Sequence, residues 1–340
     1  MRLILLTLIL FLSCFLVFAY ANTGNKQAPF RNLIDQPEDT QKRASIGYML
    51  HRAWIQMTRQ KFDENKIAQL PLDLEALAQQ DFAIAWLGHD TMLIRAGNQW
   101  ILTDPVFSQH ATAVPPFGPK RLVQLPIDLK KLPHIDVVLI SHDHYDHLDL
   151  ASVKLLAKQS SGSPQFIAGI GLKNWFKANV PDANVLEMQW WDETKIANVD
   201  FQFVPAQHSS GRKFTNKNNT LWGGWVIEYT GRKLYFAGDT AYEAELFKEI
   251  KLNVGHINIA ALPVGAYMPR DYMRFEHMDP SEAVQAHIDL QADSSIAIHW
   301  GTFQLGDETS DQIRADFSLN LESKKVDNFK LLAIGQVVNF

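Results

Sequence analysis

The stretch Ile140–Leu150, with the sequence ISHDHYDHLDL, packs three histidines and three aspartates into a single short segment. It directly follows an apolar run that is typical of a buried strand. Alternate residues of an extended chain project to the same side, so His142 and His144 can share one metal ion. Asp146 and His147 can then turn toward a second ion. A solvated, histidine-rich surface loop is the alternative, but the strand in front of the segment favours a metal site.

Further ligand-type residues stand at comparable places downstream. His208 follows the strand-like run in FVPAQHSS, Asp239 follows the one in LYFAGDT, and His299 ends the one in SIAIHW. Functional side chains of sheet proteins gather at the carboxyl ends of strands. Any one of the three alone would be read as a hydrogen-bonded structural residue, but their shared position favours a common metal centre.

Length and composition bound the class of protein. A chain of 340 residues can hold one large domain or two ordinary ones, taking roughly 150 residues per domain. An apolar content of 46% and a net charge of −5 fit a folded body rather than a disordered one. The basic residues are scattered, so composition gives no support for a nucleic-acid partner.

The first 21 residues differ from the rest. Met1-Arg2 precedes the apolar run Leu3–Phe18, and Ala19-Tyr20-Ala21 then offers a small-x-small cleavage site. These are the parts of a secretory signal peptide, which predicts export to the periplasm or cell envelope if the source is bacterial. An uncleaved membrane anchor through residues 3–20 is the alternative, and a lipoprotein attached at Cys14 is a weaker one. Cys14 is the only cysteine, so a cleaved chain has no disulfide and no thiolate.

Residues 22–80 are predicted to form a linker and an amphipathic helix. Asn22–Asp39 is polar and carries two prolines, whereas apolar residues recur at helical spacing from Ser45 onward. Such a helix can pack on the main domain or rest on lipid headgroups. We assign residues 81–340 to a catalytic domain.

Within this domain the pattern predicts strands first, and then strands alternating with helices. The predicted strands are Phe82–Leu87, Thr91–Ala96, Trp100–Thr103, Asp136–Ser141, Gln165–Ala168, Val199–Pro205, Trp222–Tyr229, Lys233–Ala237, Ile257–Pro263 and Ser295–His299. The predicted helices are Leu150–Lys158, Leu172–Lys177, Tyr242–Ile250 and Pro280–Leu290, the last with Asp279 as its N-cap. This order indicates an α/β fold in which two sheets lie between helical layers.

The segment resembles the His-x-His-x-Asp-His motif of the metallo-β-lactamase superfamily, here His142, His144, Asp146 and His147. The resemblance implies a four-layer αβ/βα sandwich and a site for two metal ions. It assigns His142, His144 and His208 to one ion, and Asp146, His147 and His299 to the other. Asp239 would bridge both ions and so take part directly in catalysis. We expect two Zn²⁺ ions, with iron or manganese as alternatives for such ligands.

A denser resemblance runs from about Trp86 to about Asp307. The segments WLGHDTMLI, ILTDPVFS, LWGGWVIE, LPVGAYMPR, HMDPSEAVQAHIDL and AIHWGTFQL are similar to those of the N-acylphosphatidylethanolamine-hydrolysing phospholipase D family and its bacterial relatives. This implies a dinuclear zinc phosphodiesterase that yields phosphatidate and an N-acylethanolamine through a metal-bridging hydroxide. The same resemblance implies a phospholipid substrate and a membrane surface as partner. The oligomeric state stays open.

Two other functions remain open at this stage. A metal-dependent lactonase or amidohydrolase of the same superfamily would use the same ligands, and a metal-binding envelope protein would use them without turnover. The chain also departs from the phospholipase family at three positions near the site. Asp90 stands where the family usually has alanine, Ser209 replaces a bulky aromatic, and Glu276 replaces glutamine. None removes a ligand, but all three leave the preference for acyl chain and headgroup open.

Several residues are candidates for supporting roles. His277 is predicted to bind the phosphate or to protonate the leaving oxygen, with a structural role ahead of the helix as the alternative. Asp104 is predicted to orient a ligand, and His89 is a lesser candidate of the same kind. Tyr267 and Met268 begin an aromatic and methionine-rich stretch that would line a groove for acyl chains, although core packing explains them almost as well.

Overall fold

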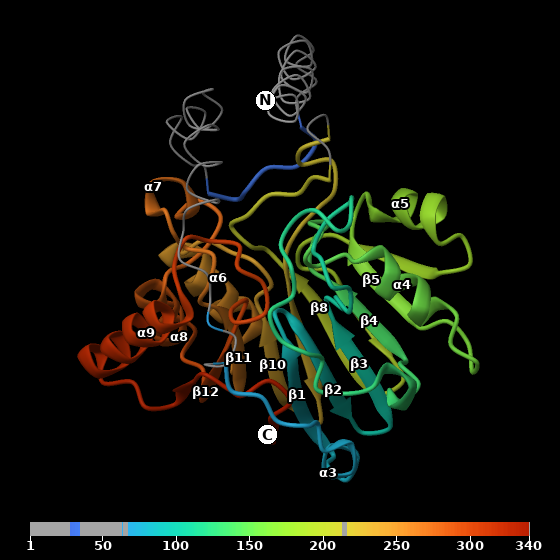
Figure 1. Ribbon diagram of the computed structural model, residues 1–340, viewed down its shortest axis with the longest axis horizontal. Helices are drawn as coiled ribbons and strands as arrows, with labels where there is room; N and C mark the ends of the chain where they lie inside the picture. Colours follow the sequence, from blue (N-terminus) through green and yellow to red (C-terminus); the bar gives the residue numbers. More distant parts are fainter. Residues whose placement is uncertain (1–27, 35–62, 64–66, 213–215, 340) are drawn as a thin grey trace, which may run out of the picture.

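The computed structural model describes residues 28–34, 63, 67–212 and 216–339. Two seven-stranded sheets face each other, and helices cover their outer sides (Figure 1). One sheet has the order β14-β1-β2-β3-β4-β5-β6, and the other has the order β13-β12-β11-β10-β9-β8-β7. The predicted four-layer α/β sandwich is therefore confirmed.

The first sheet begins as an antiparallel meander and continues with parallel strands. Its strands are β1 (Phe82–Gly88), β2 (Thr91–Ala96), β3 (Gln99–Thr103), β4 (Val137–Ile140), β5 (Gln165–Gly169), β6 (Asn184–Met188) and β14 (Val337–Asn339). The helices α4 (Leu150–Ala157) and α5 (Leu172–Asn179) cover its outer side (Figure 1). All four residues of β4 are buried, as expected for a parallel strand covered on both faces.

The second sheet repeats this plan. Its strands are β7 (Glu193–Ile196), β8 (Val199–Val204), β9 (Gly224–Tyr229), β10 (Arg232–Phe236), β11 (Ile259–Pro263), β12 (Ser294–Ile298) and β13 (Phe329–Lys330). Its helices are α6 (Ala244–Val254), α8 (Pro280–Leu290) and α9 (Ser310–Lys324), while α3 (Leu74–Ala78), η4 (Leu129–Lys131) and α7 (Arg270–Met273) are short. Asp279 caps α8 in a capping box with Glu282, as its sequence predicts.

The alternation of side chains within each strand builds two apolar layers. Ile94 of β2 contributes to the large core between the sheets, whereas its neighbour Leu93 packs into a second core under α4 and α5. Trp86 and Trp225, both fully buried, join the central layer from opposite sheets. The two sheets are thus held face to face by apolar contact, and the polar site is confined to their edge.

The N-terminal predictions are only partly accessible to the structure. The signal peptide or anchor and the helix from Ser45 lie outside the described residues. Among the residues that the structure does describe, no helix combines the length and apolar character needed to cross a membrane. Residues 28–34, within the predicted linker, lie against the main domain: Phe30 donates a backbone hydrogen bond to Asn218, and the side chain of Gln207 donates one to Ile34.

Candidate metal centre

The ligand-type residues come from both sheets and meet at one edge of the sandwich. His142 and its neighbours form the turn between β4 and α4. His208 follows β8, Asp239 follows β10, and His299 comes immediately after β12. Each strand carries its residue to the same edge because the strand itself is fixed in the core. The sheet arrangement thus brings together residues that are far apart in the sequence.

The first cluster holds three imidazoles and a carboxylate, those of His142, His144, His208 and Asp239. The Nδ1 atom of His144 lies 2.9 Å from Nε2 of His142 and 3.3 Å from Nε2 of His208. Oδ2 of Asp239 lies 3.7 Å from Nε2 of His208 and 3.9 Å from Nε2 of His142. Ring nitrogens that converge on one point form a suitable site for a transition-metal ion.

The second cluster combines His89, Asp146, His147 and His299. Oδ2 of Asp146 lies 3.4 Å from Nε2 of His147 and 3.5 Å from Nε2 of His299. Asp239 also reaches this cluster, with Oδ2 at 3.1 Å from His147 and Oδ1 at 3.0 Å from His299. The carboxylate of Asp239 therefore lies between the two clusters, where the predicted bridging ligand is required.

Buried polar atoms without hydrogen bonds show that the second cluster fits a metal ion. Among the described residues, Nε2 of His147, both ring nitrogens of His299 and Oδ1 of Asp239 are buried without a hydrogen-bond partner. Each such atom costs roughly 1–3 kcal/mol when nothing replaces its water. Nε2 of His147, Nε2 of His299 and Oδ1 of Asp239 lie close together, as ligand atoms around a cation would, whereas Nδ1 of His299 lies on the other edge of its ring.

The electrostatics of the second cluster lead to the same conclusion. Burial alone lowers the pKa of His299, but the carboxylates of Asp239 and Asp146 outweigh it and raise that pKa to about 10. Burial also opposes ionisation of Asp239, but His299 and His147 hold the pKa of this carboxyl well below its usual value. The carboxylates of the second cluster thus favour positive charge nearby. Protons on the imidazoles supply it in the absence of metal, and a bound cation would replace those protons.

Asp104 contacts His147 at Nδ1, on the ring edge opposite the Nε2 atom that faces Asp146 and Asp239, and its orienting role stays a prediction. Its Oδ2 lies 2.8 Å from Nδ1 of His147, while its Oδ1 accepts a 2.7 Å hydrogen bond from the backbone N–H of Ser141. The hydroxyl of Ser141 also lies 2.9 Å from Nδ1 of His142. One carboxylate and one hydroxyl thereby fix ring nitrogens of both clusters.

Left-handed backbone conformations gather at the site. His89, Asp104 and His299 have φ angles of +52°, +33° and +60°. For residues with a side chain this conformation costs roughly 1–2 kcal/mol each. The surrounding fold evidently imposes these angles, and strain of this kind clusters at functional sites.

One predicted residue lies closer to the ligands than expected, and one contribution was not anticipated from the sequence. His89, predicted only as a minor orienting residue, lies in the second cluster with Nε2 at 3.1 Å from Asp146 Oδ2. The side-chain oxygen of Asn32 accepts hydrogen bonds of 3.1 Å from the backbone N–H of His208 and from the indole of Trp222. Asn32 is 176 positions from His208, and no local pattern marks that contact.

His277 lies beside both clusters. Its Nδ1 is 3.8 Å from Oδ2 of Asp239, and its ring centroid is 5.2 Å from that of His299 and 5.3 Å from that of His208. Arg270 fixes this position by donating a hydrogen bond to the carbonyl of His277. The structure therefore brings His277 to the centre, while its chemical role stays a prediction.

Tyr267 and Met268 lie where core packing also explains them. The hydroxyl of Tyr267 donates a 2.6 Å hydrogen bond to Asp316 of α9, and the ring is buried in the central core. Met268 packs against the same core, and Glu308 accepts a hydrogen bond from its backbone N–H. Nothing in these contacts tests the predicted role of either residue in substrate binding.

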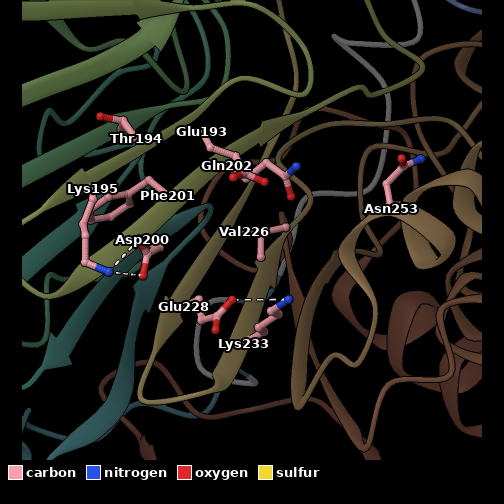
Figure 2. Close-up of a pocket in the computed structure, with 10 residues that line it drawn as sticks. All are labelled: Glu193, Thr194, Lys195, Asp200, Phe201, Gln202, Val226, Glu228, Lys233 and Asn253. Atoms are coloured by element: carbon pink, nitrogen blue, oxygen red, sulfur yellow. Dashed lines mark hydrogen bonds and ion pairs between the residues drawn. The ribbon is translucent and has the colours of Figure 1, made fainter.

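Part of the centre reaches solvent. The side chains of Asp146 and His277 are 16% and 12% exposed, whereas those of His147 and His299 are fully buried. A hollow of about 790 Å³, lined by Tyr145, among others, lies beside the motif. Another, of about 360 Å³, lies over β7–β10 and carries compensated ion pairs such as Lys195 with Asp200 (Figure 2).

The comparisons with known proteins agree with this geometry. Residues 99–300 match the model of the beta-lactamase superfamily domain. The chain belongs to the metallo-β-lactamase superfamily. Within it, the chain belongs to the N-acylphosphatidylethanolamine-hydrolysing phospholipase D family, since it is 35% identical to phospholipase D 1 of that name from Caenorhabditis elegans over 72% of each chain. The mitochondrial relative from Saccharomyces cerevisiae is 36% identical over 66% of this chain, but over only 48% of its own length.

More distant members of the superfamily include metal-dependent hydrolases. One from Myxococcus xanthus is 28% identical over 72% of this chain and 79% of its own. Among solved structures, an isothiocyanate hydrolase from Delia radicum gut bacteria superimposes with a TM-score of 0.60 at 18% identity, covering 76% of this chain and 98% of its own. A metallo hydrolase from Ignicoccus hospitalis gives 0.54 at 20% identity, with 76% and 98% covered. These likenesses in structure show the shared fold, and the sequence relatives identify a metal-dependent hydrolase.

Proposed function

We propose that this metal-dependent hydrolase is a dinuclear zinc phosphodiesterase of the phospholipase D type. Its substrate would be an N-acylphosphatidylethanolamine or a close relative, cleaved to phosphatidate and an N-acylethanolamine. The observation that carries the proposal is Asp239, whose carboxylate lies within 3.0–3.9 Å of ring nitrogens from both clusters. A carboxylate in this position can serve two ions at once.

The residues present fit such a pair of ions. When bound, two divalent cations supply an activated water at neutral pH and offset the negative charge that develops on the phosphoryl oxygens. The nitrogen-rich first cluster and the mixed second cluster both offer ligands that zinc accepts. No nucleophilic serine or cysteine is required.

The side chains of this chain would orient the reacting groups. Asp104 holds His147 in one ring orientation, and Asn32 holds the backbone of His208. His277 is partly exposed beside Asp239, from where it would contact a phosphoryl oxygen of a bound substrate. Burial holds its pKa well below the ordinary value, so we assign the neutral imidazole the role of hydrogen-bond donor to the phosphate rather than that of acid.

The substrate class is supported by the relatives, two of which are named for hydrolysis of N-acylphosphatidylethanolamine. A phospholipid substrate implies a membrane surface as partner. The export predicted from residues 1–21 would place the protein in the periplasm or cell envelope of a bacterium. Ser209 and Glu276, which replace larger or uncharged residues of the family, lie beside His208 and His277 in sequence and would adjust the headgroup preference.

Product analysis tests the proposal. The purified, zinc-loaded protein is incubated with a panel of lipid phosphodiesters and, separately, with lactones, and the products are identified by mass spectrometry. We expect phosphatidate and N-acylethanolamine, and we expect Asp239→Asn to abolish their formation. Brisk lactone hydrolysis without lipid turnover would instead identify a lactonase, and unchanged turnover by Asp239→Asn would refute the dinuclear mechanism.

A further inference from the structure

Asp90 is a fully buried carboxylate that no predicted role has used. It follows His89 in the turn between β1 and β2, and its exposed fraction is 0%. Neither of its carboxylate oxygens accepts a hydrogen bond from any described residue. In the part of the chain that the structure describes, its one recorded ion pair is with Nδ1 of His147, at 3.6 Å. A carboxylate in such surroundings opposes folding unless something compensates it.

His147 cannot supply that compensation alone. Its Nδ1 already lies 2.8 Å from Asp104, which is the shorter and stronger of the two contacts. On the opposite edge of the ring, Nε2 lies 3.1 Å from Asp239 and 3.4 Å from Asp146. Four acidic side chains therefore surround His147, whose imidazole can carry only a single positive charge. His299 contacts two of them, Asp239 at 3.0 Å and Asp146 at 3.5 Å, but has no recorded ion pair with Asp90 among the described residues.

A cation in the second cluster would add positive charge close to these four acidic side chains. Asp90 approaches the cluster closely, since one of its oxygens lies within 4.8 Å of both a carboxylate oxygen of Asp239 and a ring nitrogen of His147. Asp90, His147 and Asp239 form one of the groups that could hold a metal ion, but Asp90 contacts His147 at Nδ1, on the ring edge opposite the Nε2 atom that faces Asp146 and Asp239. Asp90 thus stands directly behind the ligands, where its charge acts on the ion without a bond to it.

We propose that Asp90 sets the strength with which the second cluster binds its cation, acting through His147 and through its own negative charge. Burial of this acidic group without hydrogen-bond partners costs stability in the metal-free fold, and a bound cation would offset that cost. The proposal rests on the two-ion centre of the proposed function but not on the lipid substrate. Asp90 is a positioning residue in this account.

Two variants separate this role from a structural one. Asp90→Asn keeps the shape and removes the charge, and Asp90→Ala removes both. After removal of metal with a chelator, we expect both variants to melt at or above the temperature of the unchanged metal-free protein. Titration with Zn²⁺ against a chromophoric chelator should show second-ion binding about 10–100-fold weaker, with first-ion binding unchanged. The rise in melting temperature on adding Zn²⁺ should shrink accordingly.

Glu308→Gln is the matched control, because Glu308 is also a buried carboxylate but accepts hydrogen bonds from the backbone of Ala266 and Met268 at 2.6 and 3.0 Å. That variant should melt lower without metal and keep its affinity for the second ion. The proposal for Asp90 is overturned if both of its variants melt lower without metal, or if second-ion affinity is unchanged. The stoichiometry of the unchanged protein tests the two-ion centre separately, since a single bound ion would contradict the proposed function itself.

Discussion

His147 shows how a single residue can depend on several others at once. Asp104 and Asp90 face its Nδ1 atom, while Asp146 and Asp239 face its Nε2 atom. The ring can therefore present Nε2 to a metal only if its other nitrogen keeps its proton on the side of Asp104. The metal affinity of such a histidine therefore depends on the carboxylate that orients its ring.

Replacement of Asp104 by asparagine tests this dependence. Asp104→Asn preserves the shape but presents an amide that no longer accepts the Nδ1 proton as a carboxylate does. We expect zinc affinity at the second cluster to fall about 10–100-fold, measured by competition with a chelator. Asp136→Asn, which alters a carboxylate bound to the backbone of Trp100 instead, serves as the control. Equal zinc affinity in the two variants would refute an orienting role for Asp104.

The sequence predicts the ligand residues better than their supports. The motif spacing and the strand ends identify His142 through His299 because ligand type and strand position are both local properties. Ser141 and Asn32 support His142 and His208 by hydrogen bonds that no spacing marks. Asn32 is supplied by a segment 176 positions earlier, so only the folded chain reveals its role.

At the scale of elements, the metal centre depends on how closely the backbones of neighbouring strand ends approach each other, as well as on the ligand residues. Gly265 follows β11 beside the end of β12, and a Cβ added there would lie 2.2 Å from the carbonyl oxygen of His299. That oxygen is backbone and cannot swing away. Only glycine allows the two strand ends to meet at the distance that places the His299 ring in the second cluster.

Gly265→Ala should therefore destabilise the fold by roughly 1–3 kcal/mol, as overpacking does, and displace His299. Urea unfolding measures the first effect, and zinc titration measures the second. Gly231→Ala, at the turn between β9 and β10, has no atom within 4 Å of the added Cβ and should cost only about 1 kcal/mol with zinc affinity retained. Normal zinc affinity in Gly265→Ala would contradict this account of the strand ends.

The elements that the sequence missed share a weak pattern. The predicted strands have runs of apolar residues, and all of them are present. In contrast, β7 alternates exposed with half-buried residues, and β13 is only two residues long. The long helix α9 buries little apolar surface, chiefly Ile313 and Phe317, so it lacks a marked apolar stripe. Contacts with neighbouring elements, rather than a local sequence pattern, therefore determine where such elements form.

At the scale of the whole molecule, the metal centre joins the two sheets. His142, His144, Asp146 and His147 come from the loop after β4, whereas His208, Asp239 and His299 come from the other sheet. Without cations, the carboxylates and imidazoles of the two halves meet with buried polar atoms that have no hydrogen-bond partner. Bound metal should thus contribute to the stability of the entire sandwich.

Removal of metal by a chelator should lower the melting temperature. Saturation at 100 times the dissociation constant stabilises a fold by about 2.7 kcal/mol, which corresponds to a shift in melting temperature of about 5 °C for a domain of this size. Restoring Zn²⁺ should return the original melting temperature, as followed by circular dichroism. A melting temperature that is the same with and without metal would show that the centre does not join the two halves.

The contact made by residues 28–34 bears on where this protein can be cut. A shortened version that starts at residue 81 would retain every predicted ligand yet discard the Asn32 amide that steadies the backbone under His208. Limited proteolysis between residues 34 and 81 would sever the same support from the main body. A version for crystallisation or assay should accordingly begin upstream of residue 28.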